Sequence, residues 1–391
     1  MDASISGRAA IVGLGATEFS KNSGRTELRL AMEAVLAALA DAGIDPREVD
    51  GFSSYTVDKV PEYEVARLLG AREVNFFSQV PHGGGAACAP VLHAAMAVAT
   101  GVARTVVVYR AMNERSWYRF GSGSYGFAST PIFENVNYGW YMPQGFHTPA
   151  AWVGMFARRY MHRFGATSED FGRISVAVRD FAATNPAAFF HGKPITLADH
   201  QASRWICEPL RLLDCCQESD GAVAMVITSA ERARDMKTRP VLIKAGAQGI
   251  SPGQQIMTSL YRDDITGLPE MGLVAKRLWQ QSGLAPADIQ TAVIYDHFTP
   301  FVLQQLEEFG FCARGEAKDF VRAGHHARGG KLPINTHGGQ LGEAYIHGMN
   351  GIAEAVRQLR GDAVNQVAGV EHVLVTAGTG VPTSGLILGK A

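Results

Sequence analysis

A seven-residue pattern occurs twice in this chain, 240 residues apart, and it limits the possible folds more than any other feature. Residues 43–49 and residues 283–289 both read glycine, aliphatic, any residue, proline, any residue, acid, aliphatic. A helical pattern precedes each copy, at residues 26–42 and 273–283, and a strand-like run follows it. Glycine with proline shortly beyond is typical of a helix end. The repeat predicts a tandem duplication of a βα unit, with a chance match over seven positions as the alternative.

Two glycine-rich turns support this division, because one occurs in each half, at residues 82–85 (HGGG) and 337–339 (HGG). An alanine-rich helical stretch follows each turn, and an apolar strand-like run follows each stretch. The stretches are residues 86–100 and 350–359, and the runs are residues 105–109 and 373–376. Alternating strands and helices predict an α/β fold in which helices cover the sheets.

The sequence becomes aromatic and glycine-rich between residues 112 and 150. This segment is too long for a plain connection and too apolar for a linker. A binding loop or lid and an oligomer contact explain it equally well. The expected segments are the first part of the N-terminal half (1–111), an inserted loop or substrate region (112–195), the end of the N-terminal half (196–239) and the C-terminal half (240–391).

Composition and charge exclude several classes of protein. A formal net charge of −1 over 391 residues gives no electrostatic reason to expect nucleic acid or an anionic membrane as a partner. No stretch approaches the roughly 18 uninterrupted apolar residues of a membrane span, and the polar residues 1–8 do not resemble a signal peptide. The five cysteines have no CxxC spacing, so we expect reduced thiols, no metal site and a cytoplasmic location.

The glycines that follow the first strand-like run, at residues 9–13, do not form a dinucleotide-binding motif. Gly13 and Gly15 match the first two glycines of GxGxxG, but the third position is Glu18. We interpret the pair as turn glycines.

Six short motifs give the chain a resemblance to the thiolase superfamily, in its sterol-carrier-protein-x and lipid-transfer-protein branch, over nearly its whole length. They are residues 11–15 (IVGLG), 41–44 (DAGI), 157–162 (ARRYMH), 219–224 (SDGAVA), 296–299 (DHFT) and 335–339 (NTHGG). The resemblance implies the thiolase fold, a layered αβαβα arrangement of two duplicated halves whose catalytic loops meet at the centre. It also implies at least a dimer, formed through the first half.

The same resemblance aligns the loops that carry thiolase chemistry, and the reactive residues are replaced. Thiolases use a cysteine thiolate, an activating histidine and a second cysteine. The nucleophile position aligns with Gly85 and the activating histidine with Tyr345, and Tyr295 stands where a residue of the third loop helps to build an oxyanion site. The last loop, residues 375–380, contains no cysteine. Cys88 falls three residues beyond the nucleophile position, inside the expected helix, where we interpret it as a small buried hydrophobe.

The aligned loops retain a backbone site for a CoA thioester. The N–H groups expected to face the thioester oxygen, and so to stabilise an enolate, are those of Gly83, Gly84, Gly85, Gly378 and Gly380. An enolate together with two phenolic proton donors suits retro-aldol cleavage of a β-hydroxyacyl-CoA without a covalent intermediate. Tyr345 is the expected base because it replaces the histidine, and Tyr295 the expected acid, although the roles can be exchanged.

A phenolic base needs help, because a free phenol is only about 0.1% ionised at pH 7, an offset of roughly 4 kcal/mol. A nearby cation would lower its pKa. The candidates for supporting or pKa-tuning groups are Asp296, His297, His337 and His347. A local turn is expected to point His347 away from the place of the missing imidazole. The structural alternative is that both tyrosines are core rings with satisfied hydroxyls.

The two tyrosines make the chain similar to the lipid-transfer-protein aldolases of bacterial steroid side-chain degradation. That similarity implies a substrate of the 17-hydroxy-3-oxo-pregnene-carboxyl-CoA type, cleaved to a 17-ketosteroid (androstenedione type) and propionyl-CoA. It also implies an OB-fold acyl-CoA-associated partner, a homodimer core in a heterotetramer, and no cofactor beyond the CoA thioester substrate. Two alternatives stay open: a catalytically inactive homologue that binds acyl-CoA or lipid for a partner, and a true thiolase that uses Cys88.

Overall fold

Nine strands form one continuous mixed sheet in the computed structural model, which describes residues 5–117, 119, 139–255, 259–379 and 382–391. In sheet order the strands are β3 (Phe76–Val80), β2 (Gly51–Tyr55), β4 (Val106–Asn113), β7 (Asp220–Ser229), β1 (Ala9–Ala16), β8 (Val241–Gly249), β11 (Thr383–Lys390), β10 (His372–Thr376) and β9 (Thr291–Val293). A separate two-stranded sheet pairs β5 (Trp205–Cys207) with β6 (Leu210–Arg211).

The two halves of the large sheet repeat one topology. The order β2-β4-β7-β1 in the first half corresponds to β9-β10-β11-β8 in the second. In each half the first pair of strands is parallel and the next two pairs are antiparallel. The halves join where β1 pairs with β8. This correspondence confirms the predicted duplication, and the four-segment division of the chain stays a prediction.

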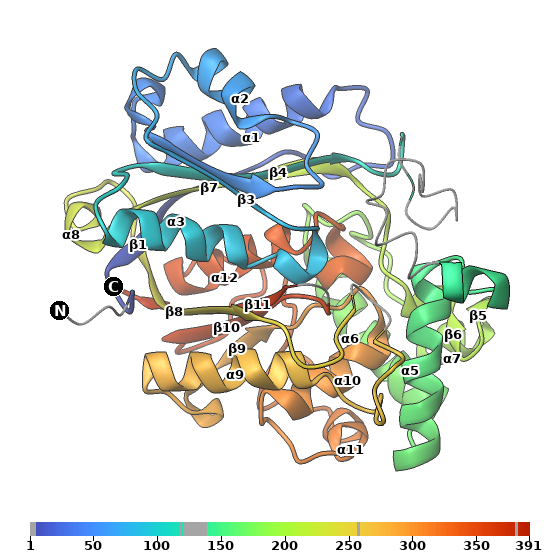
Figure 1. Cartoon of the computed structure of the whole chain (residues 1–391). Coiled ribbons are helices and arrows are strands. Elements are labelled where there is room, and N and C mark those ends of the chain that lie inside the picture. The colour runs from blue at the N-terminus through green and yellow to red at the C-terminus, as the bar shows by residue number, and fades with distance from the viewer. Residues whose placement is uncertain (1–4, 118, 120–138, 256–258, 380–381) are drawn as a thin grey trace.

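Helices cover the sheet in layers. They are α1 (Glu27–Ala42), α2 (Glu62–Leu69), α3 (Ala89–Ala99), α5 (Pro149–Phe164), α6 (Ser168–Thr184), α7 (Leu197–Ala202), α8 (Ala230–Ala233), α9 (Pro269–Ser282), α10 (Thr299–Glu308), α11 (Ala317–Arg322) and α12 (Met349–Arg360). In Figure 1, α1 and α2 lie above the first half of the sheet, α3 and α12 lie between the halves, and α9, α10 and α11 lie below the second half. The predicted αβαβα layering is confirmed.

The repeated seven-residue pattern marks the ends of α1 and α9. Gly43 and Gly283 cap these helices with φ of 69° and 70°, a left-handed conformation that glycine adopts without a Cβ clash. In each copy the proline then begins a short 3-10 turn, at Pro46–Glu48 and Pro286–Asp288, that leads into the next strand. The pattern is therefore a helix stop followed by a turn that returns the chain to the sheet.

Gly13 and Gly15 correct the interpretation of that segment as a turn. Both lie inside β1, which continues to Ala16. A Cβ at either position would lie 2.1 Å from a backbone oxygen of α1, that of Ala38 for Gly13 and that of Ala34 for Gly15. These glycines are needed because the helix backbone packs directly on the strand.

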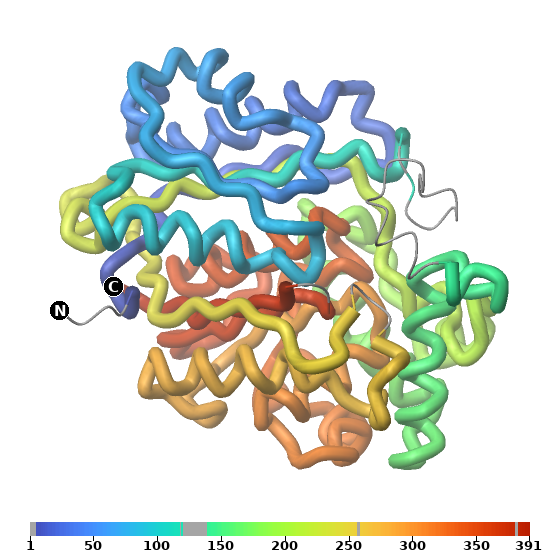
Figure 2. The backbone as a smooth tube through the Cα atoms, viewed as in Figure 1, coloured from blue at the N-terminus to red at the C-terminus, as the bar shows by residue number. Residues whose placement is uncertain are grey.

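The central layer brings the catalytic loops of the two halves together. One buried apolar cluster contains residues from α3, α12 and the inner faces of both halves of the sheet, and Tyr295 belongs to it. In the tube view, the turn before α3 and the segments around α12 and the end of β10 lie side by side in this layer (Figure 2). The site expected from the sequence therefore lies between the halves.

The aromatic segment at residues 112–150 is described only in part, because residues 118 and 120–138 lie outside the described residues. Its predicted role as a binding loop or an oligomer contact stays a prediction. No helix within the described ranges is long and apolar enough to cross a membrane.

Candidate active site

Tyr295 is held rigidly two residues after β9. Its backbone N–H donates to Thr376 Oγ1 at 2.9 Å, and its carbonyl oxygen accepts from Gln305 Nε2 at 2.8 Å. These bonds tie the residue to β10 and to α10. The side chain is buried, with 2% of its surface exposed. Its position is thus fixed by strands and helices of the second half.

Tyr345 approaches the same point from a different loop. It follows a one-turn π-helix, η8 (Gly339–Glu343), and its backbone N–H donates to Ser219 Oγ at 3.1 Å. The Tyr295 hydroxyl donates a hydrogen bond of 3.3 Å to the Tyr345 oxygen. The structure therefore brings together the two phenols that the sequence singled out, from loops 50 residues apart.

Three glycines make room for the Tyr295 ring. A Cβ at Gly84 would lie 2.2 Å from the Tyr295 hydroxyl oxygen, and a Cβ at Gly378 or Gly348 would lie 2.8 or 2.9 Å from ring carbons. None of these distances is compatible with a side chain. Glycine at the former nucleophile turn thus provides space for the phenol.

The backbone N–H groups predicted to bind the thioester oxygen are not all free to donate. The Gly378 N–H already donates to Gly84 O at 2.9 Å, so this amide is occupied and its predicted role is not supported. Bonds within the turn run from the amides of Ala86 and Ala87 to the oxygens of Gly83 and Gly84. They leave the amides of Gly83, Gly84 and Gly85 as the candidate donors. Gly380 lies outside the described residues.

His347 points into the site, so the expectation that it points away is wrong. Its φ is 48°, and its ring lies edge-on to the Tyr345 ring with centroids 5.1 Å apart. A Cβ at Gly83 would lie 2.3 Å from the imidazole. Arg110 Nε donates to His347 Nδ1 at 3.1 Å. The left-handed backbone turns the imidazole back toward the glycine turn of the first half.

His297 lies beside Tyr295, with ring centroids 4.8 Å apart. Burial lowers the pKa of His297 to about 3 and that of His347 well below its usual range. Both imidazoles are therefore neutral near pH 7 and do not supply the cation that would lower the pKa of a phenol.

Asp296 and His337 have neighbours other than the phenols. Asp296 accepts from the Gln340 N–H at 2.8 Å, and burial raises its pKa to about 6. His337 Nε2 lies 3.9 Å from Glu343 Oε2, and burial lowers the pKa of His337 to about 3. These contacts fix the loop that carries Tyr345.

Both phenols are hard to ionise in this environment. Burial, and after it the charges of neighbouring groups, raises the pKa of Tyr295 and of Tyr345 well above the usual range. Cys216 and Glu114 are among the neighbours that raise both. A phenolate is therefore harder to form here than on a free tyrosine.

Cys88 has no features of a reactive thiol. It caps α3, a position just before the helix and not inside it as expected. Its side chain is fully buried, and burial raises the thiol pKa well above its usual range. The sulfur donates to Val375 O at 3.7 Å. A buried neutral thiol of this kind is a poor nucleophile.

Sequence reasoning missed Arg110, a charged side chain that β4 presents to this site. Arg110 is buried, bonds to His347 and lies 3.2 Å from Asp58. Glu114, just after the strand, is also buried. The signal was available, because a charged residue, Arg110, interrupts an apolar strand-like run (VVVYRAM) and a charge in a buried strand is unusual.

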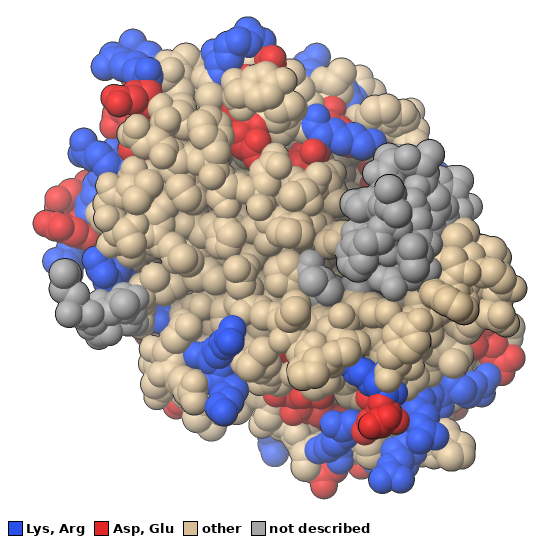
Figure 3. Space-filling model, viewed as in Figure 1, with Lys and Arg blue, Asp and Glu red and all other residues tan. Residues whose placement is uncertain are grey.

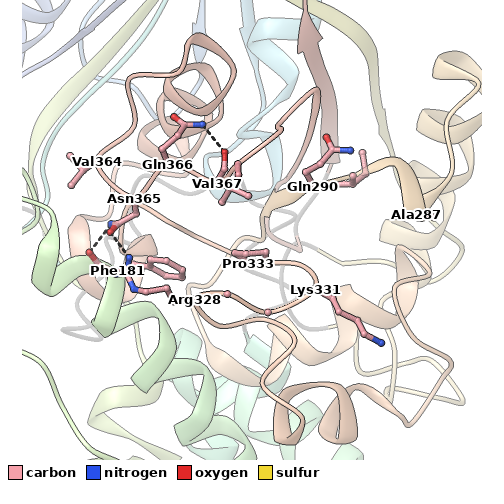
Figure 4. A pocket seen from close by; sticks show the side chains of 14 residues that line it. Phe181, Ala287, Gln290, Arg328, Lys331, Pro333, Val364, Asn365, Gln366 and Val367 are labelled. Atoms are coloured by element: carbon pink, nitrogen blue, oxygen red, sulfur yellow. Dashed lines mark hydrogen bonds between the residues drawn. The ribbon is translucent and has the colours of Figure 1, made fainter.

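A cavity of about 610 Å³ lies elsewhere in the second half (Figure 4). Phe181, Arg328, Lys331 and Asn365 line it, together with Gln290, which precedes β9. Tyr295 follows that strand, so this cavity lies at the other end of β9. Across the described part of the chain, no group of three or more His, Cys, Asp and Glu side chains has an arrangement that could hold a metal ion.

Comparison with known proteins gives consistent matches. Residues 254–390 match the family model "Thiolase C-terminal domain-like". The chain is 68% identical to the 17-hydroxy-3-oxo-4-pregnene-20-carboxyl-CoA lyase of Mycobacterium tuberculosis, over 98% of this chain and 100% of that protein. It is 64% identical to the steroid side-chain-cleaving aldolase of Thermomonospora curvata, over 98% of each chain.

A solved structure extends the similarity to three dimensions. The structure of an Ltp2-ChsH2(DUF35) aldolase superposes with a TM-score of 0.94 at 63% identity, and the match covers 99% of this chain and 98% of that one. The name of that aldolase includes a second component, ChsH2(DUF35), beside Ltp2.

Proposed function

The chain belongs to the steroid side-chain-cleaving aldolases, a family of carbon–carbon lyases on the thiolase fold, and we propose that its Tyr295–Tyr345 pair carries out retro-aldol cleavage of a β-hydroxyacyl-CoA. The observation that carries this assignment is the 3.3 Å contact between the two phenolic oxygens. The Tyr295 oxygen lies beside Gly84, in the turn that aligns with the thiolase nucleophile loop.

The reaction moves one proton from oxygen to carbon. A base removes the proton of the β-hydroxyl, the Cα–Cβ bond breaks, and a ketone and a thioester enolate result. An acid then protonates the enolate carbon to give a saturated acyl-CoA. Neither step requires the acyl group to be attached to the enzyme.

The paired phenols suit both steps. Tyr345, as phenolate, takes the hydroxyl proton, and Tyr295 gives its own proton to the enolate carbon. Transfer of a proton from Tyr345 to Tyr295 across their hydrogen bond then restores the starting state. The amides of Gly83, Gly84 and Gly85 are the proposed donors to the enolate oxygen. If Tyr295 is instead the base and Tyr345 the acid, the protons balance in the same way.

The substrate proposed for this chain is 17-hydroxy-3-oxo-4-pregnene-20-carboxyl-CoA, the compound in the name of the Mycobacterium tuberculosis relative. Its tertiary hydroxyl lies β to the thioester carbonyl, as the reaction requires. The products are a 17-ketosteroid of the androstenedione type and propionyl-CoA. We propose no metal or organic cofactor.

A partner and a dimer complete the proposed assembly. The second component of the similar aldolase supports a partner protein, which we propose to be the OB-fold type expected from the sequence. An edge strand, β3, exposes Phe77, and the neighbouring α3 exposes Met96. Figure 3 shows few charged side chains across the middle of this face. These features support a homodimer core formed through the first half.

The test is product analysis with a panel of β-hydroxyacyl-CoA esters, with and without the OB-fold partner. Mass spectrometry should detect propionyl-CoA and the ketosteroid in equal amounts from the 17-hydroxy steroid ester. Tight binding of the esters without release of propionyl-CoA under any condition would contradict cleavage and support the binding protein.

A further inference from the structure

His347 accepts a hydrogen bond from a group that can only donate. Arg110 Nε donates to His347 Nδ1 at 3.1 Å, and both side chains are buried. A guanidinium group stays protonated in proteins and has no acceptor atom, so Nδ1 must hold a lone pair. A neutral imidazole with a lone pair on Nδ1 carries its proton on Nε2. This contact therefore assigns both the charge and the tautomer of His347.

Arg110 is itself held in place from a second side. Its Nη1 atom lies 3.2 Å from Asp58 Oδ2 and donates to Ala111 O at 3.0 Å. The Asp58 side chain is fully buried. Separation of a buried ion pair leaves an uncompensated charge, which is strongly unfavourable. The ion pair thus keeps Nε directed at the imidazole, and the imidazole keeps one tautomer and one orientation.

The imidazole packs on the glycine turn of the first half. A Cβ at Gly83 would lie 2.3 Å from His347 Nδ1 and 2.8 Å from Nε2, so only glycine leaves room for the ring. On another side the ring meets the Tyr345 ring edge-on, with centroids 5.1 Å apart. The Nε2–H group therefore lies in the same small region as the glycine amides and a reacting phenol.

We propose that His347 is a catalytic residue whose Nε2–H donates a hydrogen bond to the thioester oxygen, beside the amides of residues 83–85. When the Cα–Cβ bond breaks, its electron pair moves into the enolate and negative charge develops on that oxygen. A donor held at this point stabilises the developing charge. No proton leaves the imidazole, so the proton balance of the reaction is unchanged. The inference rests on the proposed retro-aldol function, and it makes Arg110 the positioning residue of His347.

The first test compares His347→Gln with His347→Met, each with the partner protein present. Glutamine keeps an oxygen that can accept from Arg110 and an N–H group in the place of Nε2, whereas methionine has a similar size and no donor. Loss of one oxyanion donor costs roughly 100- to 1,000-fold in kcat. We expect kcat of His347→Met to fall about 100-fold with KM within about 3-fold of the parent. The kcat of His347→Gln should stay within about 10-fold of the parent.

The second test examines whether Arg110 acts through the imidazole. Arg110→Lys keeps a positive charge beside Asp58 but has no Nε to donate to Nδ1. In the parent it should lower kcat about 10-fold. In the His347→Met variant the same substitution should change kcat less than about 2-fold, because no tautomer remains to be fixed. A purely structural role of Arg110 would instead give equal losses in both chains.

Two results would overturn the catalytic role of His347: a folded His347→Met variant with the kcat of the parent, or a His347→Gln variant that loses as much activity as His347→Met. If His347→Met does not fold, a folded His347→Gln variant that loses about 100-fold in kcat overturns it. A parent chain that releases no propionyl-CoA would contradict the proposed function itself, so the two failures are distinguishable.

Discussion

The turn before α3 and the loop before α12 occupy corresponding places in the two duplicated halves, yet they contribute different groups to the site. The first, at residues 83–88, consists of glycine, alanine and one buried cysteine. The second, at residues 337–348, carries Tyr345 and His347 into the site. In the proposed mechanism the first loop provides space and backbone amides, and the second provides the reacting oxygen of Tyr345. Duplicated scaffolds can thus divide a site into a half that makes room and a half that reacts.

Removal of the phenolic oxygens should have the largest effect. Tyr345→Phe and Tyr295→Phe each delete a proton carrier while keeping the ring, so each should lower kcat by roughly 1,000-fold or more. The control is the melting temperature, which should stay within a few degrees of the parent. Full activity of Tyr345→Phe would show that the second loop does not supply a reacting oxygen, and full activity of Tyr295→Phe would show that its phenol does not take part in the reaction.

A side chain in the first loop should have the next largest effect. In Gly84→Ala the new Cβ would lie 2.2 Å from the Tyr295 oxygen, so the phenol must move. Displacement of a reacting group by about 1 Å can cost about 100-fold in rate, and we expect a loss of that size. Gly139→Ala is the matched control, because a Cβ there meets nothing within 4 Å. Equal activity of both variants would contradict the space-making role of the turn.

The buried imidazoles of the second half should make stability depend on pH. The pKa of His337 is about 3 in the folded chain because of burial, and about 6.5 in an unfolded chain. The unfolded state therefore binds the extra proton first, and the stability present above pH 6.5 is lost as the pH falls. In urea unfolding, His337→Gln should reduce the stability difference between pH 7.5 and pH 5.5 by about 1.4 kcal/mol. The exposed His162→Gln should not reduce it.

The smallest effect is expected at Cys88. Cys88→Ala removes a buried sulfur that bonds weakly to Val375 O, so it should lower stability by about 1 kcal/mol or slightly more. Its kcat should stay within about 2-fold of the parent. A loss of activity comparable to that of the tyrosine variants would support thiolase chemistry with Cys88 as the nucleophile. The first loop would then supply a reacting group and not only space.

The sequence predicted features that depend on local pattern. The helix ends at Gly43 and Gly283 could be predicted because glycine readily adopts the left-handed conformation of a helix cap. The repeat around these glycines predicted the duplicated fold. The positions of Tyr295 and Tyr345 followed from motif order. Each of these features is readable within a few residues of the chain.

The features that sequence reasoning missed depend on contacts between layers. Arg110 meets His347 across 237 residues of chain, and the left-handed φ of His347 has no signature in a non-glycine residue. The role of Gly13 depends on how closely α1 packs on β1.

Cleavage without a covalent intermediate can be checked directly from the intact mass of the chain during turnover of the steroid CoA ester, with product release followed in the same sample. Propionyl-CoA should accumulate while the protein mass stays that of the unmodified chain. An acyl adduct on any cysteine that forms and disappears at the rate of turnover would contradict it.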